Sequence, residues 1–180
     1  MNYENLKGMK DSISADSEFV KTAIDQIVDK YSKELDEFVL LVRELLQLIK
    51  QASMQEYDDQ SLELQIIKLP TILYFAGNGL EDIGAESEIA AYKRKELYNQ
   101  IVEDLHDVSS DKRYTILDKK AAAEKATESE EIIERIYDRA YKKLKGKIEH
   151  AIKLLESLKK VADLRIAKMN KGKGWDKGGI

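Results

Sequence analysis

The chain has 180 residues, a single proline and no cysteine, a length that fits one domain with a core of its own. The lack of cysteine excludes disulfides, thiolate nucleophiles and zinc sites built from cysteine. A composition rich in Ala, Glu, Lys, Leu and Ile predicts an all-α protein. The start has no signal-peptide pattern and no apolar run is long enough to span a membrane, so we expect a cytoplasmic protein.

Charge is distributed unevenly along the chain. Residues 1–138 hold 17 Lys and Arg against 30 Asp and Glu, a net charge of −13, whereas residues 139–180 hold 13 against 4, a net charge of +9. The two parts sum to the formal net charge of −4. This asymmetry predicts an anionic partner for the basic end, or an acidic neighbour in an assembly.

The first predicted long helix spans about residues 17–53, after a polar and flexible arm at 1–15. Its apolar side chains alternate in steps of four and three, which is the spacing of a heptad seam. We predict that this seam packs against another helix and mediates oligomerisation, in the same chain or between copies. The seam residues are Ile24, Val28, Tyr31, Leu35, Phe38, Val42, Leu45 and Ile49.

Two shorter helices are predicted next, at about 61–76 and 81–107. The first contains Pro70, which is expected to kink or restart a helix because it removes a backbone hydrogen bond. The Gly77-Asn78-Gly79 sequence between them is typical of a helix stop, since these residues tolerate positive φ.

A last long helix is predicted at about 115–170, with one slip in its apolar spacing at Leu144 and Ile148 that resembles a coiled-coil stutter. Residues 171–180, with Trp175, are rich in Gly and Lys and predict a flexible tail. The segments together predict one helical domain over residues 16–170. Its fold class is an elongated antiparallel helical bundle of long helices resembling those of coiled coils.

No segment carries a catalytic signature, so we expect no enzyme activity, no cofactor and no metal site. The glycines from Gly77 to Gly84 lack the Gly-Lys-Ser/Thr of a phosphate-binding loop and the strand that precedes it. Glu103 and His106 match one Glu-x-x-His element of a di-iron bundle, but the chain has no second such element. The acidic residues near 128–134 are explained by a solvated helix N-terminus.

The basic part of the last helix is the most informative region for function. At about 100° per residue, most of its cations share one side, and the tail continues the series. One account is that this stripe contacts the phosphates and bases of single-stranded nucleic acid; the other is that it pairs with acidic flanks of neighbouring helices. The candidate nucleic-acid-binding residues are Arg139, Lys142, Lys143, Lys147, Lys153, Lys160, Arg165, Lys168, Lys171, Lys173 and Trp175.

Residues 90–172 resemble phage recombination mediators of the UvsY type in their order of segments. A lysine-rich helix that begins Ala-Tyr-Lys-Arg-Lys-Glu-Leu-Tyr at residue 91 precedes a polar break and a lysine-rich run at 115–125. A long closing helix then ends in Leu-Glu-Ser-Leu-Lys-Lys-Val-Ala-Asp-Leu-Arg-Ile-Ala-Lys-Met from residue 155. The resemblance implies a small helical protein that oligomerises, binds single-stranded DNA and loads a recombinase.

The leading hypothesis is therefore a non-catalytic, oligomeric helical accessory factor of phage-type DNA recombination or replication. Its expected partners are further copies of itself, single-stranded DNA and a recombinase or other protein, with no membrane partner. Two alternatives stay open. One is a structural coiled-coil assembly protein, such as a virion component, scaffold or adaptor; the other is an inhibitor that mimics DNA with its acidic face.

Overall fold

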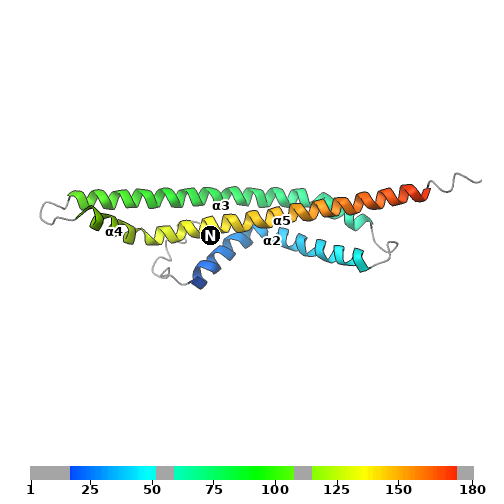
Figure 1. The fold of residues 1–180 in the computed structure, drawn as a ribbon, viewed down its shortest axis with the longest axis horizontal. Helices are drawn as coiled ribbons and strands as arrows, with labels where there is room; N and C mark the ends of the chain where they lie inside the picture. Colours follow the sequence, from blue (N-terminus) through cyan, green and yellow to red (C-terminus); the bar gives the residue numbers. More distant parts are fainter. Residues whose placement is uncertain (1–16, 52–58, 108–114, 174–180) are drawn as a thin grey trace, which may run out of the picture. The chain divides into compact units, whose positions relative to one another are not determined.

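The computed structural model describes residues 17–51, 59–107 and 115–173, and these ranges are all-α and contain no strand. Long helices pack antiparallel, with α3 beside α5 and running in the opposite direction (Figure 1). The predicted all-α fold class of antiparallel long helices is confirmed. The helices are α2 (Ser17–Gln51), α3 (Asp59–Asp107), α4 (Ile116–Ala126) and α5 (Glu128–Lys173).

Contacts within the chain group its residues into two compact units, and the single helical domain over residues 16–170 stays a prediction. Unit 1 comprises Met1–Tyr31 and Asn78–Leu144, and unit 2 comprises Ser32–Gly77 and Lys145–Ile180. Each of α2, α3 and α5 therefore contributes one segment to each unit. The physical reason is that a long helix contacts only the part of a neighbour that lies level with it, so contacts group by position along the helices.

In unit 1, the pairing of α3 with α5 is antiparallel and close. Gly84 of α3 faces the ring of Tyr141, and further along α3 the Arg94 Nε lies 3.1 Å from the Glu134 Oε2, without the alignment of a hydrogen bond. The fully buried apolar residues of unit 1 with larger side chains are Ile27, Val28, Ile83, Ile133, Ile136, Tyr137 and Leu144.

In unit 2, a continuous apolar core lies between the three helices. Its buried members come from all of them: Leu35, Phe38 and Val42 from α2, Leu69 and Ala76 from α3, and Ala151 and Leu158 from α5. Here α2 runs parallel to α5, because Asp36 pairs with Lys147 and Arg43 contacts His150 further along both helices. Ala151 and Leu158 in this core hold α5 against α2 and α3.

The predicted heptad seam of α2 is largely buried, and its apolar side chains pack against other helices of the same chain. Val28, Leu35 and Val42, spaced by seven, are at most 1% exposed. Ile24 and Phe38 are buried as well, while Tyr31 and Leu45 are half-buried. These seam side chains pack within the chain, and their predicted role in oligomerisation stays a prediction. The side chain of Ile49 lies outside the described residues.

The predicted break between 61–76 and 81–107 is wrong, because α3 is one helix that passes through Pro70 and the glycines. Leu69, Ala76, Ile83 and Ala90 are spaced by seven and are at most 2% exposed. The apolar repeat thus continues without a shift across the predicted stop. Burial of this face outweighs the low helix propensity of glycine and proline, which packing commonly overrides.

Gly79 does not end a helix as the sequence predicted, but lies at a close contact between two helices. A Cβ at this position would overlap Cβ, Cγ and Cδ1 of Tyr31 on α2. The Tyr31 hydroxyl donates a hydrogen bond to Asp82 Oδ2 at 3.2 Å and accepts one from Lys30 Nζ at 2.8 Å. Because only a hydrogen atom fits between the ring and the α3 backbone, Gly79 permits the close contact between α2 and α3 in unit 1.

The last predicted helix, 115–170, is divided at Thr127 into α4 and α5. The Thr127 hydroxyl donates to the carbonyl oxygen of Ala123 at 2.9 Å, and its backbone N–H bonds the same carbonyl at 3.0 Å. Threonine competes with helix continuation through such local bonds. Thr115 begins α4 in a capping box with Asp118, in which each side chain accepts a backbone N–H of the other residue.

Within the part of the chain that the structure describes, no helix is long and apolar enough to cross a bilayer. The predicted N-terminal arm at 1–15 lies outside the described residues, as does Trp175 with the end of the predicted tail. Helix α5 itself extends to Lys173, a few residues beyond the predicted end of the helix at 170.

Candidate nucleic-acid interface

The structure places the predicted basic stripe along α5 and divides it between the two units. Most of its cations are exposed, and Lys147 and Arg165 are half-buried. The exposed members are Arg139, Lys142, Lys143, Lys153, Lys160 and Lys168. The side chains of Lys171 and Lys173, like the whole of Trp175, lie outside the described residues.

The middle of the stripe is neutralised within the chain. Lys143 Nζ lies 2.5 Å from Asp25 Oδ1 on α2 in unit 1, and Lys147 in unit 2 pairs with Asp36 and donates to the Ser32 hydroxyl at 2.9 Å. Lys142 pairs with Asp138, one turn earlier on α5, at 2.7 Å. These contacts favour the account in which part of the stripe pairs with an acidic neighbouring helix, here α2 of the same chain.

The distal part of the stripe differs from the middle. Lys153 and Lys160 are exposed, and neither forms an ion pair with any residue that the structure describes. They are seven residues apart and therefore lie on the same face of α5. Arg165 and Lys168 each take part in an interaction within the chain. Lys153 and Lys160 are thus the stripe cations in unit 2 best placed to meet an anionic ligand.

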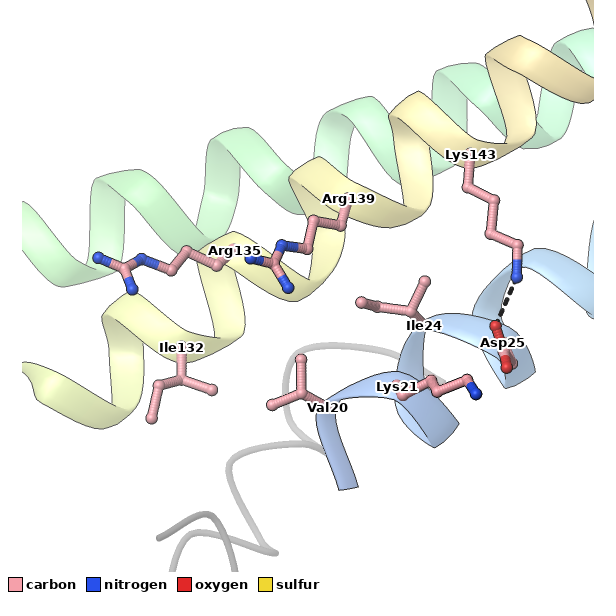
Figure 2. A pocket seen from close by; sticks show the side chains of 8 residues that line it. All are labelled: Val20, Lys21, Ile24, Asp25, Ile132, Arg135, Arg139 and Lys143. Atoms are coloured by element: carbon pink, nitrogen blue, oxygen red, sulfur yellow. Dashed lines mark hydrogen bonds and ion pairs between the residues drawn. The ribbon is translucent and has the colours of Figure 1, made fainter. Parts of the chain in front are cut away.

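Unit 1 contains a hollow of about 530 Å³ between the first turns of α2 and the first half of α5 (Figure 2). Its apolar lining comes from both helices, with Val20 and Ile24 one turn apart on α2 and Ile132 on α5. Its other lining residues are Lys21, Asp25, Arg135, Arg139 and Lys143, of which Arg139 and Lys143 belong to the predicted stripe.

Helical spacing explains why these residues meet. Ile132, Arg135, Arg139 and Lys143 follow one another in steps of three and four, so one face of α5 supplies an apolar side chain and three cations. Arg135 on α5 and Lys21 on α2 were not predicted as site residues from the sequence. Arg135 could have been predicted from helical spacing, because it is one turn before Arg139. Lys21 could not, because its place at the hollow depends on the packing of α2 against α5.

The rim of the hollow carries four cations and one carboxylate, a net charge of +3. Arg135 pairs with Glu131 on the outer side of α5, and Lys143 pairs with Asp25 across the rim, as the dashed line in Figure 2 shows. No ion pair of the described residues involves Arg139 or Lys21. The hollow is therefore a place of positive charge in a chain region that is acidic on average.

Burial raises the pKa of the Tyr137 phenol far above its ordinary value, so this hydroxyl stays neutral. No group of three or more His, Asp or Glu side chains within the described ranges is arranged to hold a metal ion. The side chain of His106, the partner of Glu103 in the Glu-x-x-His pattern, lies outside them.

Comparisons with protein-family models, with curated proteins and with solved structures find no match to this chain. The resemblance of residues 90–172 to UvsY-type mediators stays a prediction.

Proposed function

We propose that this protein is a non-catalytic accessory factor of DNA recombination or replication that binds single-stranded nucleic acid along the basic face of α5. The observation that carries the proposal is the presence of Lys153 and Lys160 on one face of α5 in unit 2 as exposed cations without an ion pair among the described residues. The protein would act by holding and presenting a strand to a partner protein. It would not change the strand chemically.

Phosphate groups are the ligands that suit these cations. Lysine side chains on one helix face neutralise successive phosphates and release condensed counterions, which makes such binding strongly dependent on salt. A single strand is flexible enough to follow a line of cations along one helix, and its bases need no groove for recognition. The paired residues Lys143 and Lys147 contribute less, because a phosphate has to compete with Asp25 and Asp36 for them.

The proposal is tested by fluorescence anisotropy of a labelled single-stranded oligonucleotide. The double charge reversal Lys153→Glu/Lys160→Glu is compared with a matched control in the same unit, Lys33→Glu/Lys68→Glu, which alters exposed lysines of α2 and α3. Both variants change the net charge of the protein by the same amount. Only the first removes cations from the proposed binding face.

We expect the wild-type protein to bind at low salt, the control to bind with a similar affinity, and the α5 variant to bind at least about tenfold more weakly, as expected for the loss of two phosphate contacts. Absence of binding by the wild-type protein at low salt overturns the proposal. Equal weakening by both variants also contradicts it, because that result assigns binding to net charge alone.

A second candidate function, assembly into a larger structure, is favoured by exposed apolar side chains in unit 2. On α3, Leu69 and Ala76 face the core, whereas Ile67 and Tyr74 on another face of the helix are 70% and 66% exposed. Leu64 and Phe75 are exposed beside them, and α2 exposes Leu40 and Leu41. Helices that are apolar on more than one face are usually covered by a partner.

Sedimentation velocity separates this candidate from a protein that functions as a monomer. Assembly through α3 predicts a concentration-dependent increase in sedimentation coefficient, which Ile67→Glu/Tyr74→Glu abolishes without loss of helicity. A single monomeric species at all concentrations contradicts assembly of the protein with itself.

A further inference from the structure

We propose that the hollow between α2 and α5 in unit 1 seats one nucleotide of a bound single strand, with the phosphate on Arg139 and the base against the aliphatic lining. This inference rests on the proposed function and adds a defined contact point to it. It assigns roles to Val20 and Ile132, which are not part of the basic stripe.

The shape and lining of the hollow suit a group with one apolar and one anionic end. Val20 and Ile24 of α2 and Ile132 of α5 surround the same space, and in Figure 2 the guanidinium group of Arg139 lies above Val20 and Ile24. A volume of about 530 Å³ is in the range of small-molecule sites. A nucleoside occupies the apolar space while its phosphate stays at the rim.

Arg139 is the rim cation best suited to phosphate. Its guanidinium group offers parallel N–H donors that match two phosphate oxygens, and it forms no ion pair with a carboxylate of the described residues. The other arginine, Arg135, is already paired with Glu131. Lys21 and Lys143 add positive charge on the α2 side, so the potential around an incoming phosphate is favourable from both helices.

The location of the hollow favours a nucleotide in a strand over a separate small anion. Arg139 and Lys143 line the hollow and also belong to the basic face of α5, so a strand that follows this face passes the opening. An arginine guanidinium plane is itself a surface on which a base stacks. The alternative ligand, a fatty acyl carboxylate, also combines an apolar part with an anion and is included as an outcome of the test.

The test is a double-mutant cycle in which the bases are removed from the strand and the apolar lining of the hollow is made polar. Anisotropy measurements compare an oligothymidine strand with a strand of the same length in which every sugar is abasic, on the wild-type protein and on Val20→Ser/Ile132→Ser. Both residues are half-buried, so the double substitution makes the lining polar at limited cost to the fold. Circular dichroism melts confirm that the variant is folded at the measurement temperature.

We expect the wild-type protein to prefer the strand with bases by roughly fivefold, the low end of the contribution of one base in single-strand binding. In Val20→Ser/Ile132→Ser this preference disappears while binding of the abasic strand is unchanged. The matched control Lys153→Glu, on α5 but in unit 2, weakens both strands by the same factor. Arg139→Glu weakens both strands and removes the preference as well.

Failure of this inference is distinct from failure of the proposed function. If the wild-type protein binds both strands equally, and Lys153→Glu weakens both, the strand-binding function stands and the nucleotide seat is wrong. If the wild-type protein binds neither strand, both are wrong. Binding of laurate that Val20→Ser/Ile132→Ser abolishes, with the preference for bases unaffected, overturns the nucleotide seat in favour of an acyl carboxylate site.

Discussion

The two compact units use the same three helices in different ways. Unit 2 is held by large apolar side chains such as Leu35, Phe38 and Leu158. Unit 1 also buries large apolar side chains, such as Ile136 and Tyr137, and it has in addition a close helix contact at Gly79 and a basic hollow between α2 and α5. Both units therefore have an apolar core, and the hollow is the feature that distinguishes unit 1.

The largest expected effect concerns the core of unit 2. Leu158 is fully buried, so Leu158→Ala should lower the free energy of unfolding by about 2–5 kcal/mol through lost burial and a residual cavity. Leu164, 61% exposed on the same helix and in the same unit, is the matched control, and Leu164→Ala should change stability by less than about 0.5 kcal/mol. Urea denaturation measures both. Equal effects would show that unit 2 is not organised around this core.

The next effect concerns the close helix contact of unit 1. Gly79→Ala should lower the free energy of unfolding by about 1–3 kcal/mol, because its methyl group would overlap Tyr31. Gly77→Ala, two residues earlier, meets nothing within 4 Å and should raise stability by up to about 1 kcal/mol through helix propensity. Thermal melts of the pair give the sign of each change. Stabilisation by both substitutions would contradict the close contact at Gly79.

A smaller effect is expected at α4, whose exposed start carries the capping box of Thr115 and Asp118. Thr115→Ala removes the cap of this helix and should cost about 1 kcal/mol. Because α4 has only Ala123 buried, the loss should appear as faster amide hydrogen exchange within α4 and not as global unfolding. Unchanged exchange in α4 would show that its start does not depend on the capping box.

The smallest effect is a pH dependence at the same cap. Hydrogen bonds from the hydroxyl and the backbone N–H of Thr115 hold the pKa of Asp118 below its ordinary value of 3.8. A carboxyl group with a lowered pKa stabilises the folded state above its ordinary pKa, and this contribution disappears as the pH falls through the lowered value. Protection of the α4 amides, measured as the exchange rate relative to the intrinsic rate at each pH, should therefore decrease as the pH falls through this lowered value. Thr115→Ala, which lacks the hydroxyl bond and keeps the backbone bond, should reduce that dependence. A wild-type protein whose α4 protection does not change with pH in this way would contradict the bonded carboxylate.

The sequence predicted the buried face of α2, which follows from the spacing of apolar residues along one helix. The seam of α2 was found because Val28, Leu35 and Val42 repeat every seven residues, and all are buried. The continuity of α3 was missed because the local preferences of Pro70 and the glycines were weighed above the repeat of Leu69, Ala76 and Ile83, which the sequence also contains. In that case burial over a long face outweighed local propensity.

Of the residues at the candidate site, only those of α5 could be predicted from the sequence. The cations of α5 follow from helical spacing within one segment, whereas the hollow needs Val20 and Lys21 of α2 to lie opposite Ile132 and Arg139. Which residues of two helices lie level with each other is set by tertiary packing and is not encoded in the spacing of either helix. For the same reason the pairing of Lys143 with Asp25 and of Lys147 with Asp36 could not be assigned from the sequence.

The salt dependence of single-strand binding tests the central claim most directly. A plot of the logarithm of the association constant against that of the salt concentration has a slope of about −0.7 for each phosphate contact with a single strand. The wild-type protein should therefore give a steep negative slope, and Lys153→Glu/Lys160→Glu should make it shallower by about 1.4, two contacts' worth. A slope that is the same for the wild-type protein and this variant would contradict the assignment of the basic face of α5 as the strand-binding surface.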